Sequence, residues 1–432
     1  MKHNELAILG GPSVKTGGWP ATIIKAKNTE FFLLQALHSG VWSIGSDSRD
    51  DTSFERRFAK RFAGLVGAKY CIPTISGTAA LKLALLALNI RPNDKVIIPG
   101  LTWVACATSV LSVGAIPVLV DIDRGDLCLS LEETEKHLRN GCRAIMLVHL
   151  YNSSAQISSF ASLAKKYHVP LIEDCAQSIG TKVNGKNVGN FGDIACYSFH
   201  QSKELASGEG GAVTTNNKEL FDKIELMRSD GMIYSNPDNK YYGNIIGHNM
   251  NLSEIHAAIL CGQIEEFEKN QTIKEDNASY LKEILSTEGF FTKKQNVADS
   301  KTSYFKFVIR IERNRFSSVS LDVVAKALTL ELNALVKPIY TPLNHNTLYQ
   351  PKSYPRICNA NYSDIDPASF VLPNAVWSTI RNITLHHNVL LGNKTDLDAI
   401  LIALLKLEKK ADNLSKYTIE AEKAKRVTKF NF

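Results

Sequence analysis

The stretch IACYSFHQSKELASGEGG, residues 194–211, joins a strand-like apolar run to a loop in which Lys203 precedes several glycines. A lysine on a solvated surface keeps its proton, and this is the ordinary interpretation of any single lysine. A lysine packed among small residues loses hydration, so its pKa falls and its amine becomes a nucleophile. Lys203 is therefore the candidate nucleophile of the chain.

Three other segments place polar or aromatic side chains near the ends of predicted strands. The turn at residues 76–80 (Ser-Gly-Thr-Ala-Ala) offers amides and hydroxyls that can hold a phosphate, although such residues often serve only as helix caps. Trp103 stands in a loop, where its face either covers a planar ligand or joins the core. Asp174 closely follows the apolar run 169–172, and a buried carboxylate there needs a cationic or hydrogen-bonding partner.

Together, these four features call for one ligand. Ligands of open α/β sheets gather at the carboxyl ends of the strands, so segments that are distant in sequence converge there. Pyridoxal 5'-phosphate offers a matching group to each of them: a phosphate, a ring to stack, a ring nitrogen that needs an acid and an aldehyde that needs an amine. The joint pattern predicts a pyridoxal-phosphate enzyme, with Lys203 and Asp174 as its catalytic residues and no metal.

Helical and strand-like patterns alternate from about residue 53 to 215, which is typical of a mostly parallel sheet with helices on its faces. The predicted strands lie at 70–75, 96–98, 117–120, 143–150, 171–173, 194–199 and 212–215. A strand at 304–311 and a helix at 321–332 indicate a second, smaller α/β domain. We expect an N-terminal arm and large cofactor-binding domain over 1–295, a small C-terminal domain over 296–408, and a basic helical tail over 409–432.

Composition and charge argue against several other classes of protein, such as nucleic-acid-binding and membrane proteins. The 432 residues carry a formal charge of +7, and more than half of this excess lies in the tail, so no basic face indicates nucleic acid. The uncharged stretch 96–120 is long enough to span a bilayer, but prolines and glycines divide it into strand, helix and strand, so no membrane association is expected. Eight cysteines without a CxxC pair predict free thiols and a reducing, cytoplasmic compartment.

The sequence also resembles the DegT-type (DegT/DnrJ/StrS) sugar and aminocyclitol aminotransferases, a fold-type-I pyridoxal-phosphate family. The resemblance runs from about residue 19 to 402. It is carried by the segments 76–79 (SGTA), 173–177 (EDCAQ), 198–211 with Lys203, and 247–249 (GHN). It implies a homodimer with a mostly parallel seven-stranded sheet flanked by helices, a smaller C-terminal α/β domain, and active sites at the subunit interface.

Carried over position by position, the resemblance implies a role for individual residues. Lys203 would be the Schiff-base lysine and Asp174 the partner of the pyridine nitrogen. The other cofactor contacts would be Trp103 as the stacking ring, Gln177 near the phenolic oxygen, Gly77, Thr78 and Ser198 at the phosphate, and Asn249 at the phosphate from the other subunit. The segments that border the substrate would contribute Trp42, His200, Tyr340 and His345.

The implied reaction moves an amino group from glutamate or glutamine to a keto sugar or keto cyclitol. It would serve amino sugar or aminocyclitol biosynthesis, for an antibiotic or a surface polysaccharide. Two alternatives stay open: a pyridoxal-phosphate sugar dehydratase of the same fold, and a non-catalytic regulator or partner subunit that binds the cofactor. In the dehydratases His replaces the lysine, so Lys203 speaks against that alternative.

One departure from the family concerns the substrate. After the motif at 247–249 the family often has an aromatic residue and then Arg, whereas this chain has Met250 and Asn251. A methionine at this position resembles the sequences of those branches of the family that act on cyclitols. A basic contact to an anionic substrate is therefore not expected from this place in the chain.

Overall fold

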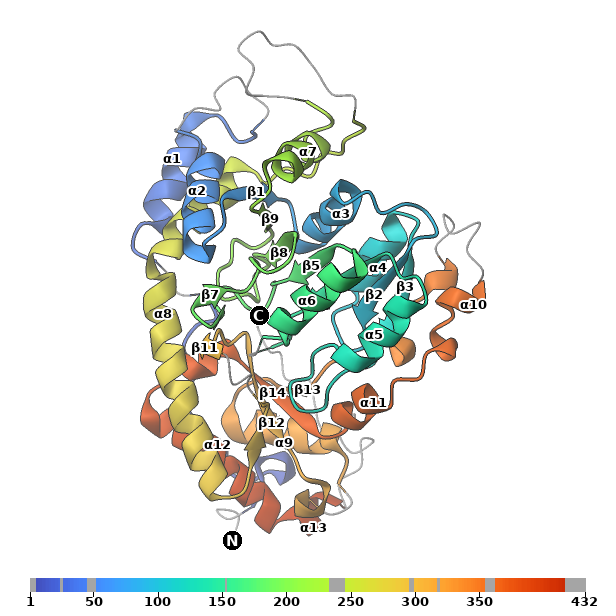
Figure 1. Ribbon diagram of the computed structural model, residues 1–432. Coiled ribbons are helices and arrows are strands. Elements are labelled where there is room, and N and C mark those ends of the chain that lie inside the picture. Colours follow the sequence, from blue (N-terminus) through green and yellow to red (C-terminus); the bar gives the residue numbers. More distant parts are fainter. Residues whose placement is uncertain are drawn as a thin grey trace.

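The computed structural model describes residues 5–23, 26–44, 52–151, 154–232, 245–294, 299–316, 319–353 and 362–415. Its centre is a seven-stranded sheet in the order β1-β9-β8-β5-β4-β2-β3 (Figure 1). The strands are β1 (Tyr70–Thr74), β2 (Lys95–Pro99), β3 (Ile116–Val120), β4 (Ala144–Val148), β5 (Leu171–Asp174), β8 (Ile194–Ser198) and β9 (Gly211–Thr215). The run from β3 to β8 is parallel, and β9 pairs antiparallel with both of its neighbours, so the predicted mostly parallel sheet is confirmed.

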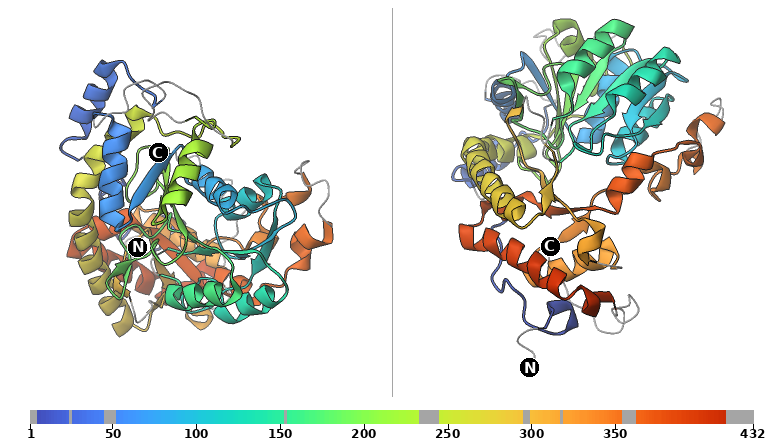
Figure 2. Two further views of the ribbon diagram at one scale, coloured as in Figure 1. Left: turned by 45° about the horizontal axis from the view of Figure 1, so that its top comes forward. Right: turned by 60° about the horizontal axis from the view of Figure 1, so that its bottom comes forward.

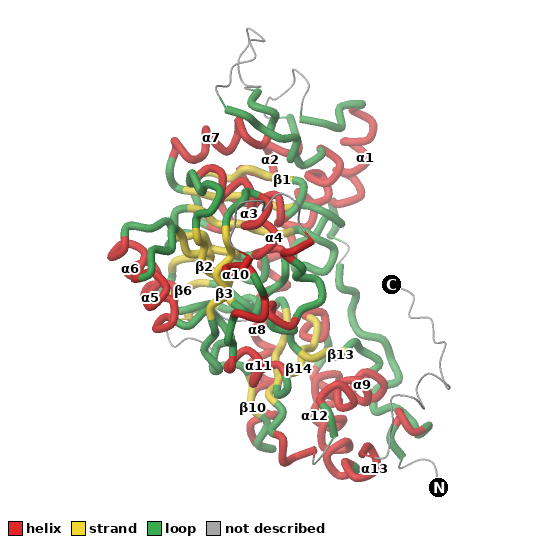
Figure 3. Tube along the Cα trace, turned by 90° about the vertical axis from the view of Figure 1, so that its right-hand side faces the viewer, coloured by secondary structure: helices red, strands yellow, loops and turns green. Residues whose placement is uncertain are grey.

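Helices cover the sheet, and most of them begin where a polar side chain caps the first turn. Ser53, Ser76 and Ser130 each accept a hydrogen bond from a backbone N–H of the helix that follows, which satisfies one of its free donors. The helices are α2 (Phe54–Val66), α3 (Gly77–Ala87), α4 (Ala105–Ser112), α5 (Leu131–Arg139), α6 (Ile157–Tyr167) and α7 (Lys218–Arg228). Helix α5 packs beside α6, while α3 packs against α4 and α7 (Figure 3).

A second, antiparallel sheet follows in the order β10-β12-β14-β13. Its strands are β10 (Phe291–Thr292), β12 (Lys306–Arg310), β13 (Val336–Pro338) and β14 (Asn382–His386). Helices α9 (Leu321–Leu332) and α12 (Lys394–Lys409) join it in a separate apolar cluster. This smaller layered unit, orange and red in Figure 2, lies beside the large sheet. The domain limits at 295 and 408 stay predictions, and the predicted tail beyond Ser415 lies outside the described residues.

The long helix α8 (Glu254–Thr287) connects the two units. It packs against α1 (Thr29–Ser39) and α2 at one end and against α12 and β10 at the other. The sequence patterns did not reveal the small sheet formed by β6 (Lys182–Val183), β7 (Lys186–Asn187) and β11 (Asp299–Lys301), because strands of two or three residues show no periodicity. None of the described helices has the length and apolar character of a membrane span.

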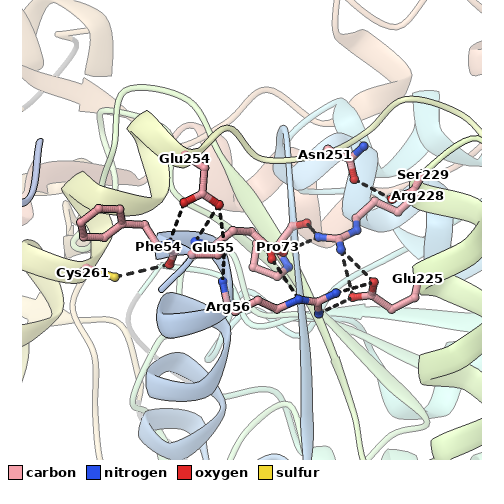
Figure 4. A network of polar contacts seen from close by, with 11 residues as sticks. Phe54, Glu55, Arg56, Pro73, Glu225, Arg228, Ser229, Asn251, Glu254 and Cys261 are labelled. Carbon is pink, nitrogen blue, oxygen red and sulfur yellow. Dashed lines mark hydrogen bonds and ion pairs between the residues drawn. The ribbon is translucent and has the colours of Figure 1, made fainter. Parts of the chain in front are cut away.

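A buried ion network ties α7 to β1 and α2 (Figure 4). Arg228 is fully buried, and its guanidinium donates to the carboxylate of Glu55 at 2.5 Å, to the carbonyl of Pro73 at 2.7 Å and to the carboxylate of Glu225 at 2.9 Å. Beside it, Glu254 accepts hydrogen bonds from the first residues of α2. The network fixes the end of α7 beneath the segment that carries residues 247–251, because Arg228 and Met250 also share a backbone hydrogen bond.

Replacement of Arg228 tests this network. We expect Arg228→Met to lower the free energy of unfolding by about 3–5 kcal/mol, because the buried carboxylate of Glu55 loses its hydrogen-bonded partner and keeps only Arg56, at 3.6 Å. Chemical denaturation of the wild type and the variant measures the difference. The control is Lys136→Met, which removes an exposed ion pair and should leave the denaturation midpoint unchanged. Equal midpoints for the two variants would show that the network contributes nothing to stability.

Candidate active site

The polar segments meet in one pocket of about 290 Å³ at the carboxyl ends of β1, β2, β5 and β8. Among the residues predicted for the site, Gly77, Thr78, Trp103, Asp174, Gln177, Ser198, His200, Lys203 and Tyr340 line it. They lie at the ends of different strands of the large sheet or in the segments that follow those strands, except Tyr340, which follows β13 of the smaller sheet. The topology therefore brings residues together that are separated by more than a hundred positions in the sequence.

The start of α3 forms one wall of the pocket. Ser76 caps the helix by accepting the N–H of Ala79 at 3.1 Å, and the side chains of Thr78 and Ser198 flank the first turn. A Cβ atom on Gly77 would lie 2.9 Å from the Cβ of Ser198, so only glycine allows the helix to start this close to β8. Unpaired amides and a positive dipole end make this wall suited to a phosphate.

Asp174 is buried at the end of β5 and faces the pocket. Its Oδ2 accepts the thiol of Cys106 at 3.2 Å, and its Oδ1 accepts the N–H of Ala176 at 3.0 Å. Burial, and then the charge of Asp174, raise the pKa of Cys106 well above its usual value, so the thiol keeps its proton and donates it. The carboxylate is thereby fixed in orientation and is suited to hold a protonated ring nitrogen.

Lys203 points its amine toward the Phe305 ring, with 4.1 Å between Nζ and the ring centroid. Burial lowers the pKa of Lys203 to about 8, while Asp174 and Glu204 partly oppose this shift. The loop is held from the smaller sheet, because the His386 ring donates its Nε2–H to the carbonyl of Ser202 at 3.1 Å. An amine with this pKa exchanges its proton readily near neutral pH, as a nucleophile or a general base must.

Aromatic rings and an amide close the side of the pocket next to Trp103. The centroids of Trp103 and Tyr340 lie 5.8 Å apart. Gln177 accepts the N–H of Tyr151 at 3.0 Å and donates to the hydroxyl of Tyr340 at 3.4 Å. The N–H of Tyr340 in turn donates to the hydroxyl of Tyr151 at 2.9 Å. Residues that follow strands of both sheets therefore contribute to this wall.

Three of the predicted residues lie outside this pocket in the described chain. Trp42 is half-exposed and donates its indole N–H to the carbonyl of Leu37 at 3.1 Å. Asn249 is exposed and accepts a hydrogen bond from Asn251. His345 is exposed at the end of the short helix Leu343–His345. Their predicted roles stay predictions, and the role of Asn249 requires a second subunit.

Sequence reasoning missed two residues at the pocket. Phe305 lies inside the predicted strand 304–311 of the small domain, where nothing in the sequence separates it from an ordinary core residue, yet it lines the pocket. Cys106 is predicted only to be a free thiol, yet it lies four residues after Thr102 and contacts both Thr102 and Asp174. Only the proximity of β5 to α4 reveals its hydrogen bond.

A cluster of His149, Glu173 and Cys175 lies behind the pocket, with its ligand-type atoms within 4.8 Å of one another. The Nε2 of His149 lies 3.0 Å from Glu173, and its Nδ1 accepts the N–H of Ala155. The carboxylate of Glu173 also accepts three backbone N–H groups, at residues 189, 191 and 192. Because these hydrogen bonds occupy the histidine and the carboxylate, the cluster is a structural brace for β5.

Comparisons with known proteins agree with this architecture. Residues 27–377 match the DegT/DnrJ/EryC1/StrS aminotransferase family. The chain is 37% identical to an L-glutamine:2-deoxy-scyllo-inosose aminotransferase of Streptoalloteichus tenebrarius, over 93% of this chain and 97% of that relative. It is 33% identical to an L-glutamine:scyllo-inosose aminotransferase of Streptomyces griseus, over 94% and 97% of the two chains. The crystal structure of 3-amino-5-hydroxybenzoic acid synthase superposes with a TM-score of 0.77 at 23% identity, covering 94% of this chain and all of that one.

The ionisation of Lys203 provides a direct test of the pocket. In the cofactor-free protein we expect Lys203 to titrate near pH 8, because burial disfavours the ammonium form. Reductive ¹³C-methylation of the lysines followed by NMR over a pH series measures this value, and the signal that is absent from Lys203→Met identifies the residue. Exposed Lys136, whose pKa is raised by Glu133 and Glu132, is the internal control. A Lys203 signal that titrates above pH 10 would contradict the burial of its amine.

Proposed function

The chain belongs to the DegT/DnrJ/EryC1/StrS aminotransferase family, and we propose that it transfers the amino group of L-glutamine to a keto cyclitol of the scyllo-inosose type. The observation that carries the chemistry is the pocket in which a lysine of lowered pKa faces the same space as a buried aspartate. The choice of substrates is supported by relatives that are similar over nearly the whole chain and are named for this donor and this class of acceptor. We further propose a role in aminocyclitol biosynthesis.

The residues present fit pyridoxal phosphate, the cofactor of this family. The start of α3 with Thr78 and Ser198 would hold its phosphate, and the closeness of Gly77 to Ser198 leaves no room there for a side chain. Asp174 would hold the ring nitrogen, and Trp103 would stack on the ring. When bound, the cofactor supplies an aldehyde that joins to amines and a ring that accepts electrons from the α-carbon of the donor.

The protein's own groups would carry the protons. With its pKa near 8, the Lys203 amine can remove a proton from the α-carbon of the donor and return it in the transfer to the acceptor. Asp174, fixed by Cys106 and Ala176, would keep the ring nitrogen protonated. The Tyr340 hydroxyl and His200 offer polar contacts to a ring with many hydroxyl groups, and Trp103 and Tyr340 limit access of water.

We also propose that the enzyme is a homodimer and works in the cytoplasm. Helix α1 leaves Phe31, Leu34 and Leu37 exposed, and Trp42 follows them, which is an unusual concentration of apolar surface for a monomer. A second copy on this face would bury it, and Asn249 could then reach the phosphate of the neighbouring site. The seven cysteines that the structure describes are free and buried, which supports a reducing compartment; Cys358 lies outside the described residues.

Spectroscopy of the purified protein tests the function. Wild type should be yellow, lose the visible band when L-glutamine is added, and regain it when a keto cyclitol such as scyllo-inosose is added. Lys203→Ala should lower the rates of the half-reaction with glutamine and of the half-reaction with the keto cyclitol by at least about 100-fold, since it removes the proton carrier. The control Lys352→Ala, at an exposed lysine, should leave both rates unchanged.

Other outcomes would discriminate among the alternatives. A yellow protein that no amino donor changes would support the non-catalytic cofactor-binding protein. Loss of a hydroxyl from a keto sugar without gain of nitrogen would support the dehydratase. Equal visible spectra and equal borohydride reactivity for wild type and Lys203→Ala would contradict the role of Lys203.

A further inference from the structure

The two faces of β12 have different surroundings. Phe307 and Ile309 belong to the apolar cluster of the smaller unit, whereas Val308 belongs to the core of the large sheet. Because side chains alternate along a strand, Lys306 lies on the same face as Val308. Strand β12 pairs Lys306 with His386, the residue that holds the Lys203 loop through the carbonyl of Ser202. Lys306 therefore stands on the side of the smaller sheet that faces the active site.

The amine of Lys306 lies close to the pocket. Its Nζ is 5.3 Å from the centroid of the Phe305 ring, which lines the pocket and which the Nζ of Lys203 approaches to 4.1 Å. Burial, and then the charges of Lys203 and Lys337, lower the pKa of Lys306 to about 8. The charge of Lys306 in turn contributes to a pKa of about 3 for His386, after the larger effect of burial, so this ring is neutral.

Within the described ranges, no carboxylate or carbonyl oxygen forms a hydrogen bond or an ion pair with the side-chain amine of Lys306. The two carboxylates that act on the neighbouring Lys203, those of Glu204 and Asp174, are already engaged by other donors. Glu204 accepts from Lys274 at 3.2 Å, from Gln271 at 2.9 Å and from Ser303 at 2.5 Å. Asp174 accepts from a thiol and a backbone N–H, as described above. A largely buried ammonium beside a second amine and without a counter-charge is costly, and a bound anion would remove this cost.

The proposed substrates offer one suitable anion. A keto cyclitol of the inosose type is uncharged, and the cofactor phosphate has its own wall at the start of α3. The α-carboxylate of the amino donor is the remaining negative group, and it is attached to the carbon whose amine must reach the pocket. We propose that Lys306 binds the α-carboxylate of the amino donor, an inference that rests on the proposed function.

The arrangement around residue 251 supports this assignment. Asn251 stands where the resemblance leads one to expect Arg, and its side chain is used within its own segment. It accepts a hydrogen bond from the Ser229 hydroxyl at 2.8 Å and donates to Asn249 at 3.3 Å. Asn251 provides no positive charge, whereas Lys306 provides one from the opposite unit of the same chain.

Binding of an unreactive analogue to the cofactor-loaded protein tests the proposal. The analogue is glutaramate, which is glutamine without its amine and keeps the carboxylate. Calorimetry should show affinity weakened about 10- to 100-fold in Lys306→Gln, as expected for the loss of a charge-assisted hydrogen bond. Lys306→Arg should retain affinity within about 3-fold. The matched control is Lys337→Gln, which removes an exposed charge from β13, a strand separated from β12 by β14, and should change affinity less than 2-fold.

The donor half of the reaction gives a second measurement. In wild type, 4-aminobutanamide, which is glutamine without its α-carboxylate, should react far more slowly than L-glutamine. Lys306→Gln should raise the KM for L-glutamine at least 10-fold, with little change for 4-aminobutanamide or for the keto cyclitol. Equal losses for both donors would mean that Lys306 acts only on the structure of the site and would overturn the proposal.

The outcomes separate this inference from the proposed function. Unchanged glutaramate affinity in Lys306→Gln overturns the carboxylate site even if glutamine proves to be the donor. If glutamine does not react with wild type, but glutaramate binds and Lys306→Gln weakens it, the carboxylate site stands and the assignment of the donor fails. If Lys306→Gln fails to fold, wild type and Lys306→Arg still test the proposal. Wild type that binds glutaramate no better than butanamide, which lacks the carboxylate, would overturn it. A strong preference for glutaramate over butanamide in both proteins would support it.

Discussion

Burial of the Lys203 amine is the constraint on which the rest of the site depends. An ammonium group removed from water is costly, and this cost lowers the pKa of Lys203 to about 8. The burial is produced from two directions. Loops of the large sheet surround the lysine on one side, and Phe305 and His386 of the smaller sheet cover it on the other.

Close backbone packing at the carboxyl edge of the sheet makes this arrangement possible. A Cβ atom on Gly211 would lie 2.4 Å from the backbone carbon of Ser76, and one on Gly77 would lie 2.9 Å from Ser198. These two contacts bring β9, the start of α3 and the end of β8 together. The same edge then carries Asp174, whose hydrogen bonds to Cys106 and Ala176 hold it in place. The phosphate wall and the acid thus share one rigid frame.

Much of the fold could be predicted from the sequence because the large unit is built from long, strongly patterned elements. The predicted strands 171–173 and 194–199 correspond closely to β5 (Leu171–Asp174) and β8 (Ile194–Ser198). The short strands around Lys182 and Asp299 escaped prediction, since two or three residues carry no period. In the site, Lys203 and Asp174 were found from their unusual neighbours, whereas Cys106 and Phe305 resembled ordinary core residues.

The amino-acid sequence specifies which chemical groups are available: an amine among small residues, an acid after a buried strand, a phosphate-type turn and the motifs of the family. These signals lie in short stretches of the chain, so they can be recognised from the sequence alone. Packing in the folded chain sets which of these groups meet and which of them are charged. Lys306 illustrates the difference. Its sequence context is that of an ordinary strand, and its lowered pKa results from burial and from packing beside Phe305 and Lys203. Electrostatic environment depends on burial and on neighbours distant in sequence, and both are properties of the folded chain.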